Sequence, residues 1–414
     1  MAGRGVTRRQ FGLGVAASVP GAGSTLAQRT IAGPRSFDTT SAVDGGQLPP
    51  SRRRLDATDI ASWMASQNVP GLAACIAQGD KLVWHDGYGM ANVSKRIPFT
   101  PDRTLFHIAS ITKTITATAV MQLRDRGHFH LDEDVGRFLK FPIRNPRYPE
   151  RPISFKHLLT HTSSINDNDA LYSTYSIGDP TMSLEEVVTR YFTMNGSLWS
   201  RRNFGNSAPG TIMRYSNAGF SLLGYLVEVI GQQPLEEYLQ QNVYRVLGMN
   251  QTSFYIAKLD PDRQARCYTY IRRVSASLCP GDGDGNLLPV GVSPRAGYNE
   301  HALYSYPTLA DGMVRTSASQ LANFMIAMMN GGRFGADRVL REETVAEMLN
   351  GHGRGLGWFK SGHHWGHDGN DPGCSTEMMF DPKRKVGLII LANAQVNLEQ
   401  VKVLLITEAE QGRT

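Results

Sequence analysis

The spacing of apolar and polar residues changes from helix to strand and back within the first third of the chain. Apolar residues at helical spacing predict a helix over residues 56–66. Short apolar runs over 72–76 and 82–85, separated by a Gly-Asp turn, predict a β-hairpin. A second helix is predicted over residues 110–126. This part of the chain therefore combines a hairpin with a helix on either side.

Helical spacing continues through the middle of the chain, and strand patterns return near its end. Residues 130–300 are predicted to be mostly helical with long loops, and Ser216 is placed to cap a helix that ends at Gly231. Later elements are helices over 317–329, 341–349 and about 398–410, and strands over 363–366, 376–381 and 386–392. Because strands lie near both ends, we predict an α+β fold whose sheet is built from both termini, with a helical subdomain over about 115–300 inserted.

The first 27 residues are predicted to be an export signal. Arg8 and Arg9 stand in a twin-arginine-like sequence, an apolar stretch follows, and small residues lead to a cleavage site after Ala27. Residues 28–54 are rich in Gly, Ser, Thr, Pro and Arg without a period, which predicts a linker. We therefore expect one exported domain over residues 55–414, in a periplasmic or secreted protein.

Charge and composition exclude several classes of protein. A hydrophobic content of 41% excludes a wholly disordered chain. The formal net charge of +6 falls to +3 without the three arginines of the export signal, and no clustered basic face is evident, so we reject nucleic acid as the main partner. No apolar run approaches the roughly 20 residues of a membrane-spanning helix, so no membrane span is expected. We expect a small-molecule or peptide substrate and leave the oligomeric state open.

Histidine, acidic and cysteine positions do not define a cofactor site. In a strand, His363 and His367 would lie roughly 13 Å apart at about 3.3 Å per residue, too far to bind one ion. The stretch 282–286 has the opening of a calcium loop but not its later positions. Cys267 and Cys279 could form a disulfide in an oxidising compartment, which spacing alone does not decide. No metal or organic cofactor is expected.

The strongest local signal for catalysis is the pair Ser110 and Lys113 at the start of a predicted helix. Residues three apart share one face of a helix, so the hydroxyl and the amine would lie together. A serine hydroxyl becomes a good nucleophile when a base removes its proton, and desolvation lowers the pKa of a lysine toward that role. The alternative is a helix-capping serine beside a solvated lysine.

Tyr215 and Asn217 form the second candidate group. A phenol near Lys113 would be pushed toward its anion, because an adjacent cation favours the charged form. Tyr215 could then move protons to and from Ser110, while Asn217 could donate a hydrogen bond to the substrate. The alternative is that this segment only packs and caps the next helix.

The third candidate group is His367, Asp368, Gly369 and Asn370. A glycine at a strand edge lets a substrate backbone approach closely, and the N–H groups of Asn370 and Ser110 could form an oxyanion hole. A hairpin turn with a surface histidine is the structural alternative. Elsewhere, His161 is expected to be structural and hydrogen-bonded in a loop, and three aromatic residues could line the cleft or simply pack: Tyr172, Tyr175 and Trp199.

In this order, the three groups resemble the serine β-lactamase and penicillin-binding-protein superfamily, in its class C-like branch. The resemblance covers about residues 56–405 and includes the flanking stretches 158–163, 247–249, 355–358 and 372–373. It implies a β-lactamase/transpeptidase-like fold, in which an antiparallel sheet flanked by helices adjoins an all-helical domain, with the site between them.

The resemblance also implies a role for each candidate residue. Ser110 would be the acylated nucleophile, Lys113 its activating partner and Tyr215 the general acid and base. The substrate contacts would be Asn217, His367, Gly369 and Asn370.

The third group departs from the Lys-Thr-Gly of the β-lactamases in that branch. Histidine is largely neutral at pH 7, and Asp368 would repel a carboxylate unless it points away. We therefore expect a preference for neutral esters or amides, or for peptides whose free amine Asp368 attracts, over β-lactams. The expected function is an exported serine hydrolase acting through an acyl-enzyme on Ser110. The alternatives are a class C-type β-lactamase, a D-alanyl-D-alanine carboxypeptidase, and a non-catalytic penicillin-binding-like module.

Overall fold

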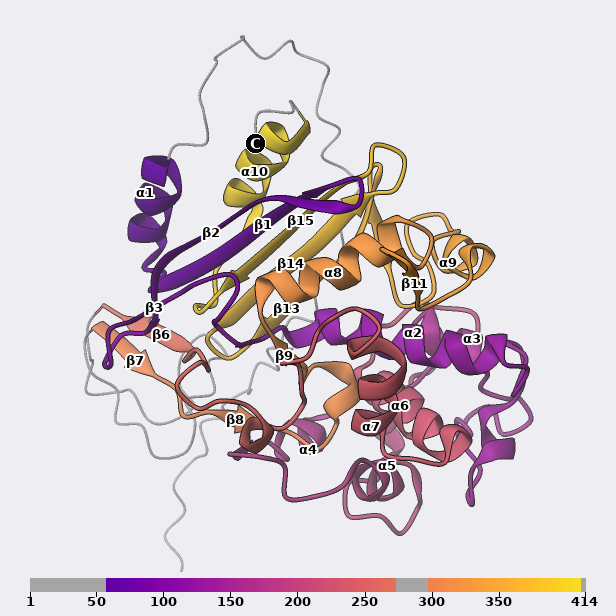
Figure 1. The fold of residues 1–414 in the computed structure, drawn as a ribbon. Helices are drawn as coiled ribbons and strands as arrows, with labels where there is room; N and C mark the ends of the chain where they lie inside the picture. The colour runs from indigo at the N-terminus through magenta and orange to yellow at the C-terminus, as the bar shows by residue number, and fades with distance from the viewer. Residues whose placement is uncertain (1–56, 273–296, 411–414) are drawn as a thin grey trace, which may run out of the picture. The chain divides into compact units, whose positions relative to one another are not determined.

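A seven-stranded antiparallel sheet organises the computed structural model, which describes residues 57–272 and 297–410 (Figure 1). Its strand order is β12-β13-β14-β15-β1-β2-β3, so strands from the two ends of the chain pair directly where β15 meets β1. The predicted export signal and linker, the stretch 282–286 and Cys279 lie outside the described residues. The strands are β1 (Gly71–Gln78), β2 (Lys81–Asn92), β3 (Ile97–Pro98), β12 (Phe359–Ser361), β13 (His364–Asp371), β14 (Cys374–Asp381) and β15 (Val386–Ala392).

Alternate residues of the central strand β1 pack into two different apolar clusters, because successive side chains of a strand point to opposite faces. Leu72, Ala74 and Ile76 join the cluster that contains the apolar residues of α1 and α10. Ala73 and Cys75 join the larger cluster that contains those of α8. The sheet is therefore covered on both faces by helices, which are α1 (Ala57–Gln67), α8 (Ala318–Met329) and α10 (Glu399–Glu410).

The helical part of the chain begins and ends at one pair of short strands. β4 (Phe106–His107) pairs antiparallel with β9 (Arg315–Thr316), and the segment between them contains most of the remaining elements. The helices in it are α2 (Thr112–Asp125), α3 (Phe155–Leu159), α4 (Asp169–Tyr172), α5 (Leu184–Phe192), α6 (Asn217–Gly231) and α7 (Leu235–Leu239). The short strands in it are β5 (Ser176–Ile177), β6 (Tyr268–Ile271), β7 (Gly297–Glu300) and β8 (Tyr304–Ser305). After α8 the chain forms a hairpin of β10 (Arg333–Phe334) and β11 (Asp337–Arg338), followed by helix α9 (Glu342–Met348).

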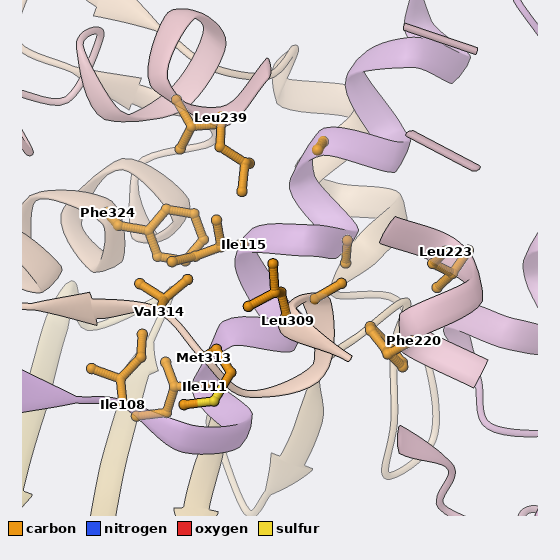
Figure 2. Close-up of a cluster of buried hydrophobic side chains, with 14 of the residues drawn as sticks. Ile108, Ile111, Ile115, Phe220, Leu223, Leu239, Leu309, Met313, Val314 and Phe324 are labelled. Atoms are coloured by element: carbon orange, nitrogen blue, oxygen red, sulfur yellow. The ribbon is translucent and has the colours of Figure 1, made fainter. Parts of the chain in front are cut away.

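α6 is the central helix of this part and contacts α2, α3, α5 and α7. Figure 2 shows the core beside it, where Ile115 of α2, Phe220 and Leu223 of α6 and Phe324 of α8 lie in one apolar cluster. Burying each such side chain stabilises the fold by about 1.5–3 kcal/mol. The core thus fixes the start of α2 against the start of α6, which are the two places where the candidate catalytic residues occur.

Most predicted elements are confirmed within one or two residues at their ends. The predicted hairpin is formed by β1 and β2, and Gly79 adopts φ 65° in its turn. Ser216 caps α6 as predicted, because its Oγ accepts a hydrogen bond from the Gly219 N–H at 2.9 Å. The predicted α+β fold class is confirmed. Within the described ranges, no helix is both long and apolar enough to cross a membrane.

Three predictions were wrong in extent. The strand predicted over 82–85 continues to Asn92. The region 130–300 contains short strands as well as helices. The strand predicted over 363–366 continues to Asp371, because each residue from Trp365 onward is paired with a residue of β14. Pairing with a neighbouring strand overrides the weak strand propensity of Asp, Gly and Asn. The third candidate group therefore lies inside a strand and not in a turn.

Candidate active site

Ser110 and Lys113 lie side by side at the start of α2. Ser110 belongs to a short 3₁₀ turn, Ala109–Ile111, that leads directly into the helix. Lys113 Nζ donates hydrogen bonds to Ser110 Oγ at 3.0 Å and to the backbone oxygen of Asp311 at 2.6 Å. Ser110 is partly exposed, whereas Lys113 is fully buried. An open hydroxyl is thus held against an enclosed amine.

Burial lowers the pKa of Lys113 to about 8, because an enclosed site disfavours the charged amine. Nearby carboxylates act in the opposite direction and limit the fall of this pKa; they are Asp311, Asp167, Asp371 and Asp368. An amine in this state is partly neutral near pH 8 and can accept a proton from a neighbouring hydroxyl.

Asp311 is a buried acid beside Lys113 that sequence patterns did not identify. It ends a 3₁₀ turn, Leu309–Asp311, and accepts a hydrogen bond from Ser221 Oγ at 3.1 Å. Burial raises the pKa of its carboxyl to about 7, while the amine of Lys113 opposes that rise. Asp311 therefore contributes a backbone oxygen that fixes the amine and an acid that tunes it.

The ring of Tyr215 lies close to both the His161 ring and the amine of Lys113. Lys113 Nζ is 4.9 Å from the centre of the Tyr215 ring, and the His161 ring is 4.4 Å away between centroids. His161 Nδ1 also accepts a hydrogen bond from the Ser216 N–H at 3.1 Å, which confirms that His161 is hydrogen-bonded in a loop. The structure thus brings Tyr215 to the other two candidate residues, and His161 holds it there.

The prediction that Lys113 pushes Tyr215 toward its anion was wrong. Burial raises the pKa of Tyr215 well above 10, and the carboxylates of Asp368, Asp311 and Asp167 add to the rise. The Ser110 side chain lies near enough to favour the phenolate slightly, but among the described residues the buried phenol oxygen has no hydrogen bond of standard geometry. Tyr215 is therefore a protonated phenol near neutral pH, suited to donating a proton.

Asn217 is the first residue of α6, and its side chain faces an aromatic residue. Its Nδ2 donates to Tyr172 Oη at 3.5 Å, and it is half-buried. Its backbone N–H donates to Asp167 at 2.9 Å. Tyr172 therefore lies at the site, next to the residue predicted to contact the substrate.

His367 is fully buried and neutral. Burial and the charge of Lys113 lower the pKa of His367 to about 3. Its Nδ1 lies 2.6 Å from the Asp368 carbonyl oxygen, which only accepts, so Nδ1 carries the proton. Nε2 is then an acceptor, and it has no partner among the described residues. The His367 ring lies 6.1 Å from the Tyr215 ring between centroids, so His367 lies at the site without charge.

The side chains of Asp368 and Asn370 lie on the face of β13 opposite to that of His367. Asp368 is paired across the strands with Glu377, which lies 3.7 Å from Lys402 of α10, so both acids face α10. Asn370 Oδ1 accepts a hydrogen bond from Ser375 Oγ at 3.1 Å on that same face. The prediction that Asp368 attracts a free amine of the substrate is therefore wrong, since strand alternation turns it away. The backbone N–H of Asn370 remains a predicted oxyanion donor.

Gly369 serves packing in a way that the sequence did not suggest. A Cβ at this position would lie 2.2 Å from Thr376 Oγ1, 2.7 Å from the Ile108 oxygen and 2.9 Å from Ala109 Cβ. This packing explains the glycine without a substrate, and its role in admitting the substrate backbone stays a prediction. Its missing side chain admits the segment before Ser110, in which Ala109 has φ 47°. β13 and the nucleophile segment are therefore in close contact through Gly369.

Asp371, at the end of β13, binds several aromatic side chains. Its carboxylate accepts hydrogen bonds from Tyr175 Oη at 2.9 Å and Tyr306 Oη at 3.0 Å, and it lies 3.2 Å from His107 Nε2. The Tyr175 ring lies 6.4 Å from that of Tyr172. Of the three aromatic residues considered earlier, Tyr172 and Tyr175 thus extend from Asn217 toward β13. Trp199 lies in a turn after α5, where its N–H donates to the Gly196 oxygen at 3.0 Å.

Other candidate residues lie away from this site. His363 is exposed in the turn before β13. Among the described residues, no group of three or more His, Cys, Asp or Glu side chains could hold a metal ion. Cys267 is a buried thiol, and its predicted partner Cys279 lies outside the described residues.

Comparison with known proteins identifies the family. The chain matches the family model described as Beta-lactamase over residues 57–412, and it therefore belongs to this family. Penicillin-binding protein 4* of Bacillus subtilis (strain 168) is 24% identical over 339 residues, which cover 80% of this chain and 69% of that protein. Protein flp of Staphylococcus aureus (strain MRSA252) is 25% identical over 362 residues, which cover 86% of this chain and 65% of that protein.

Solved structures confirm the predicted superfamily and its fold. The octameric penicillin-binding protein homologue from Pyrococcus abyssi has a TM-score of 0.63 and 25% identity, over 81% of this chain and 72% of that one. The D-amino acid amidase from Ochrobactrum anthropi SV3, complexed with L-phenylalanine amide, has a TM-score of 0.62 and 23% identity, over 81% of this chain and 89% of that one.

Proposed function

We propose that this chain is a serine hydrolase that cleaves ester or amide bonds through an acyl-enzyme on Ser110. One observation carries the proposal: the partly exposed Ser110 Oγ lies 3.0 Å from the Nζ of Lys113, whose pKa is lowered to about 8 by burial. Membership of the Beta-lactamase family supports this chemistry, and a fold neighbour is a D-amino acid amidase.

In acylation, neutral Lys113 accepts the hydroxyl proton of Ser110 while Oγ bonds to the carbonyl carbon of the substrate. The carbonyl oxygen becomes an oxyanion. When this intermediate collapses, the bond to the leaving group breaks and Tyr215 donates a proton to the departing alcohol or amine. The proton taken up by Lys113 then restores the phenol. Lys113 is thus the base in this scheme, and the protonated phenol is the acid.

Deacylation uses the same groups in reverse. Water gives a proton to neutral Lys113 and attacks the acyl carbon, which again forms an oxyanion. Oγ then leaves and recovers a proton from the Lys113 and Tyr215 pair, so that Ser110 and the carboxylic acid product are formed. No step in this scheme requires a cofactor.

The oxyanion is proposed to lie between two backbone N–H groups, from Ser110 and Asn370. The 3₁₀ turn of Ser110 precedes α2, where free N–H groups and positive helix dipole occur together. β12 pairs with β13 only from His364 to Gly366, so the described structure has no strand beside the outer edge of β13 at Asn370. Removing one oxyanion donor from a serine protease lowers kcat by about 100- to 1000-fold.

The substrate is proposed to be a neutral ester or amide, in preference to a β-lactam. His367 stands where a lysine would bind a carboxylate, and it is neutral because its pKa is lowered to about 3. Asp371 adds negative charge near the site, and Asp311 adds more as the pH rises above its pKa of about 7. A substrate carboxylate would therefore be disfavoured.

A rate comparison tests the proposal. Hydrolysis of a nitrophenyl ester, a D-amino acid amide and nitrocefin is measured for the wild type and for Ser110→Ala. We expect the ester or the amide to be cleaved much faster than nitrocefin, and all activity to be lost in the variant. Faster turnover of nitrocefin would favour the β-lactamase alternative, and no turnover or acylation by any substrate would favour a binding module.

Export to the periplasm or beyond the cell is a further part of the proposal. It is supported by the twin-arginine-like sequence around Arg8 and Arg9 and by the small residues before Ala27. The N-terminal residue of the protein recovered from outside the cytoplasm would test it, with Gln28 expected.

A further inference from the structure

Asp167 belongs to none of the three sequence motifs, yet its carboxylate binds the segment that carries two of the candidate residues. It lies in the loop after α3, 50 residues before Asn217. One oxygen, Oδ2, accepts a hydrogen bond from the Asn217 N–H at 2.9 Å. The other, Oδ1, accepts from the Ala218 N–H at 2.9 Å and lies 3.3 Å from Ser216 Oγ, which donates to it.

These bonds complete the first turn of α6. The first N–H groups of a helix have no partners within the helix, and a negative charge there interacts favourably with the helix dipole. Ser216 Oγ accepts a hydrogen bond from the N–H of Gly219, and the Asp167 carboxylate accepts hydrogen bonds from the N–H groups of Asn217 and Ala218. Three consecutive N–H groups are thus bound, and two of them depend on a residue from a distant loop.

The position of this turn determines where the candidate catalytic groups point. Tyr215 and Asn217 stand on either side of Ser216, so a shift of this turn would move both side chains. We propose that Asp167 is a positioning residue for the hydrolytic reaction, whose carboxylate fastens the first turn of α6 so that Tyr215 and Asn217 face Ser110. The inference rests on the proposed function, since it assigns a role within that reaction.

The charge of Asp167 also reaches the proposed base. Its carboxylate is one of those that limit the fall in the pKa of Lys113. Burial raises the pKa of Asp167 itself, while the N–H groups of Ala218 and Asn217 and the charge of Lys113 oppose that rise. Neutralising Asp167 therefore lowers the pKa of Lys113 further. A residue that served only as a helix cap would not change the ionisation of Lys113.

The test compares four variants of the full chain. Asp167→Asn keeps one oxygen acceptor and removes the charge, and Asp167→Ala removes both. Ser216→Ala removes the local cap, and Asp169→Asn removes an equal charge from an exposed position two residues away. Single-turnover acylation by a nitrophenyl ester is measured from pH 6 to pH 10, and thermal unfolding confirms which variants are folded.

We expect Asp167→Ala to lower the acylation rate by about 100-fold, as expected when a catalytic group is misplaced. Asp167→Asn should lower the rate less and move the rising limb of the pH profile to lower pH by roughly one unit. Asp169→Asn should have the wild-type acylation rate and the wild-type position of the rising limb. Ser216→Ala should leave the pH position of the rising limb unchanged.

Two results would overturn the inference. One is a wild-type acylation rate, with the rising limb at its wild-type pH, in both Asp167 variants. The other is a lower rate with an unmoved limb in Asp167→Asn, the result of a purely structural cap. Ser110→Ala separates this failure from that of the proposed function: if acylation persists without the Ser110 hydroxyl, the reaction itself has been misassigned, whatever Asp167 does.

Discussion

The ring of His161 lies against the ring of Tyr215, with 4.4 Å between centroids and 30° between the ring planes. His161 adopts φ 55°, a left-handed conformation that is uncommon outside glycine and is found most often in asparagine, aspartate and histidine. Burial lowers the pKa of His161 well below 6.5, so its ring is neutral and Nδ1 can accept the Ser216 N–H. One neutral side chain therefore supports both the phenol and the backbone that follows it.

Replacing His161 should slow acylation without changing its pH dependence. His161→Ala removes the ring contact and the acceptor, and we expect a loss of about 10- to 100-fold. His161→Asn should lose less, because asparagine tolerates the left-handed conformation and supplies an acceptor oxygen. The rising limb of the acylation profile should stay in place, since a neutral ring is removed. A wild-type rate in His161→Ala would show that the contact is not needed.

The acylation rate should rise with pH through about 8. Lys113 can accept the Ser110 proton only when it is neutral, so the rate is low below the lowered pKa of Lys113 and reaches a plateau above it. Lys113→Arg keeps a positive charge at every accessible pH, because the guanidinium does not deprotonate. It should lose at least about 100-fold at all pH values. A pH-independent wild-type rate, or an active Lys113→Arg, would contradict this assignment.

His367→Lys should shift selectivity toward substrates with a carboxylate. The neutral imidazole is replaced by a cation in the position where a lysine occurs in the β-lactamases that this chain resembles. The ratio of nitrocefin to ester turnover should rise at least about tenfold, the effect of one charge-assisted hydrogen bond of about 1.5 kcal/mol or more. His367→Gln, which stays neutral, is the matched control. An unchanged ratio in the lysine variant would show that this position does not select against carboxylates.

Gly369→Ala should damage the site through packing. Its Cβ would lie 2.7 Å from the Ile108 oxygen and 2.9 Å from Ala109 Cβ, so β13 or the turn of Ser110 must shift. We expect a loss of about 1–3 kcal/mol in the free energy of unfolding, together with slower acylation. Gly79→Ala is the control, because Gly79 has φ 65° but no atom within 4 Å of its added Cβ.

Gly79→Ala should lower the free energy of unfolding by about 1–2 kcal/mol through backbone strain alone. It should be acylated at the wild-type rate. Chemical denaturation and single-turnover acylation measure the two effects separately. Equal acylation by the two variants would show that close packing at Gly369 does not position Ser110.

Local patterns in the sequence were sufficient to predict most helices and strands and to predict that Ser110 and Lys113 lie side by side. The hairpin of β1 and β2, the cap at Ser216 and the α+β class follow from periodicity and turn residues. The strand through His367 was cut short because its residues have weak strand propensity, and only pairing with β14 explains its length.

The remaining features of the site depend on tertiary packing. Asp167 lies in a loop and Asp311 ends a short 3₁₀ turn, and no local sequence pattern marks either one. They reach the site only because both bind the start of α6. The pKa of Tyr215 was predicted in the wrong direction because its burial was unknown, and burial outweighs the nearby amine. Asp368 was misplaced because the phase of strand alternation was unknown.

Trapping of the acyl-enzyme tests the central claim most directly. The full chain is mixed with a slowly hydrolysed nitrophenyl ester and quenched in acid, and its intact mass and its peptides are measured. We predict a gain of one acyl group on the peptide that contains Ser110, absent in Ser110→Ala and strongly reduced in Lys113→Arg. An acyl group on another residue, or one that persists in Ser110→Ala, would contradict the account.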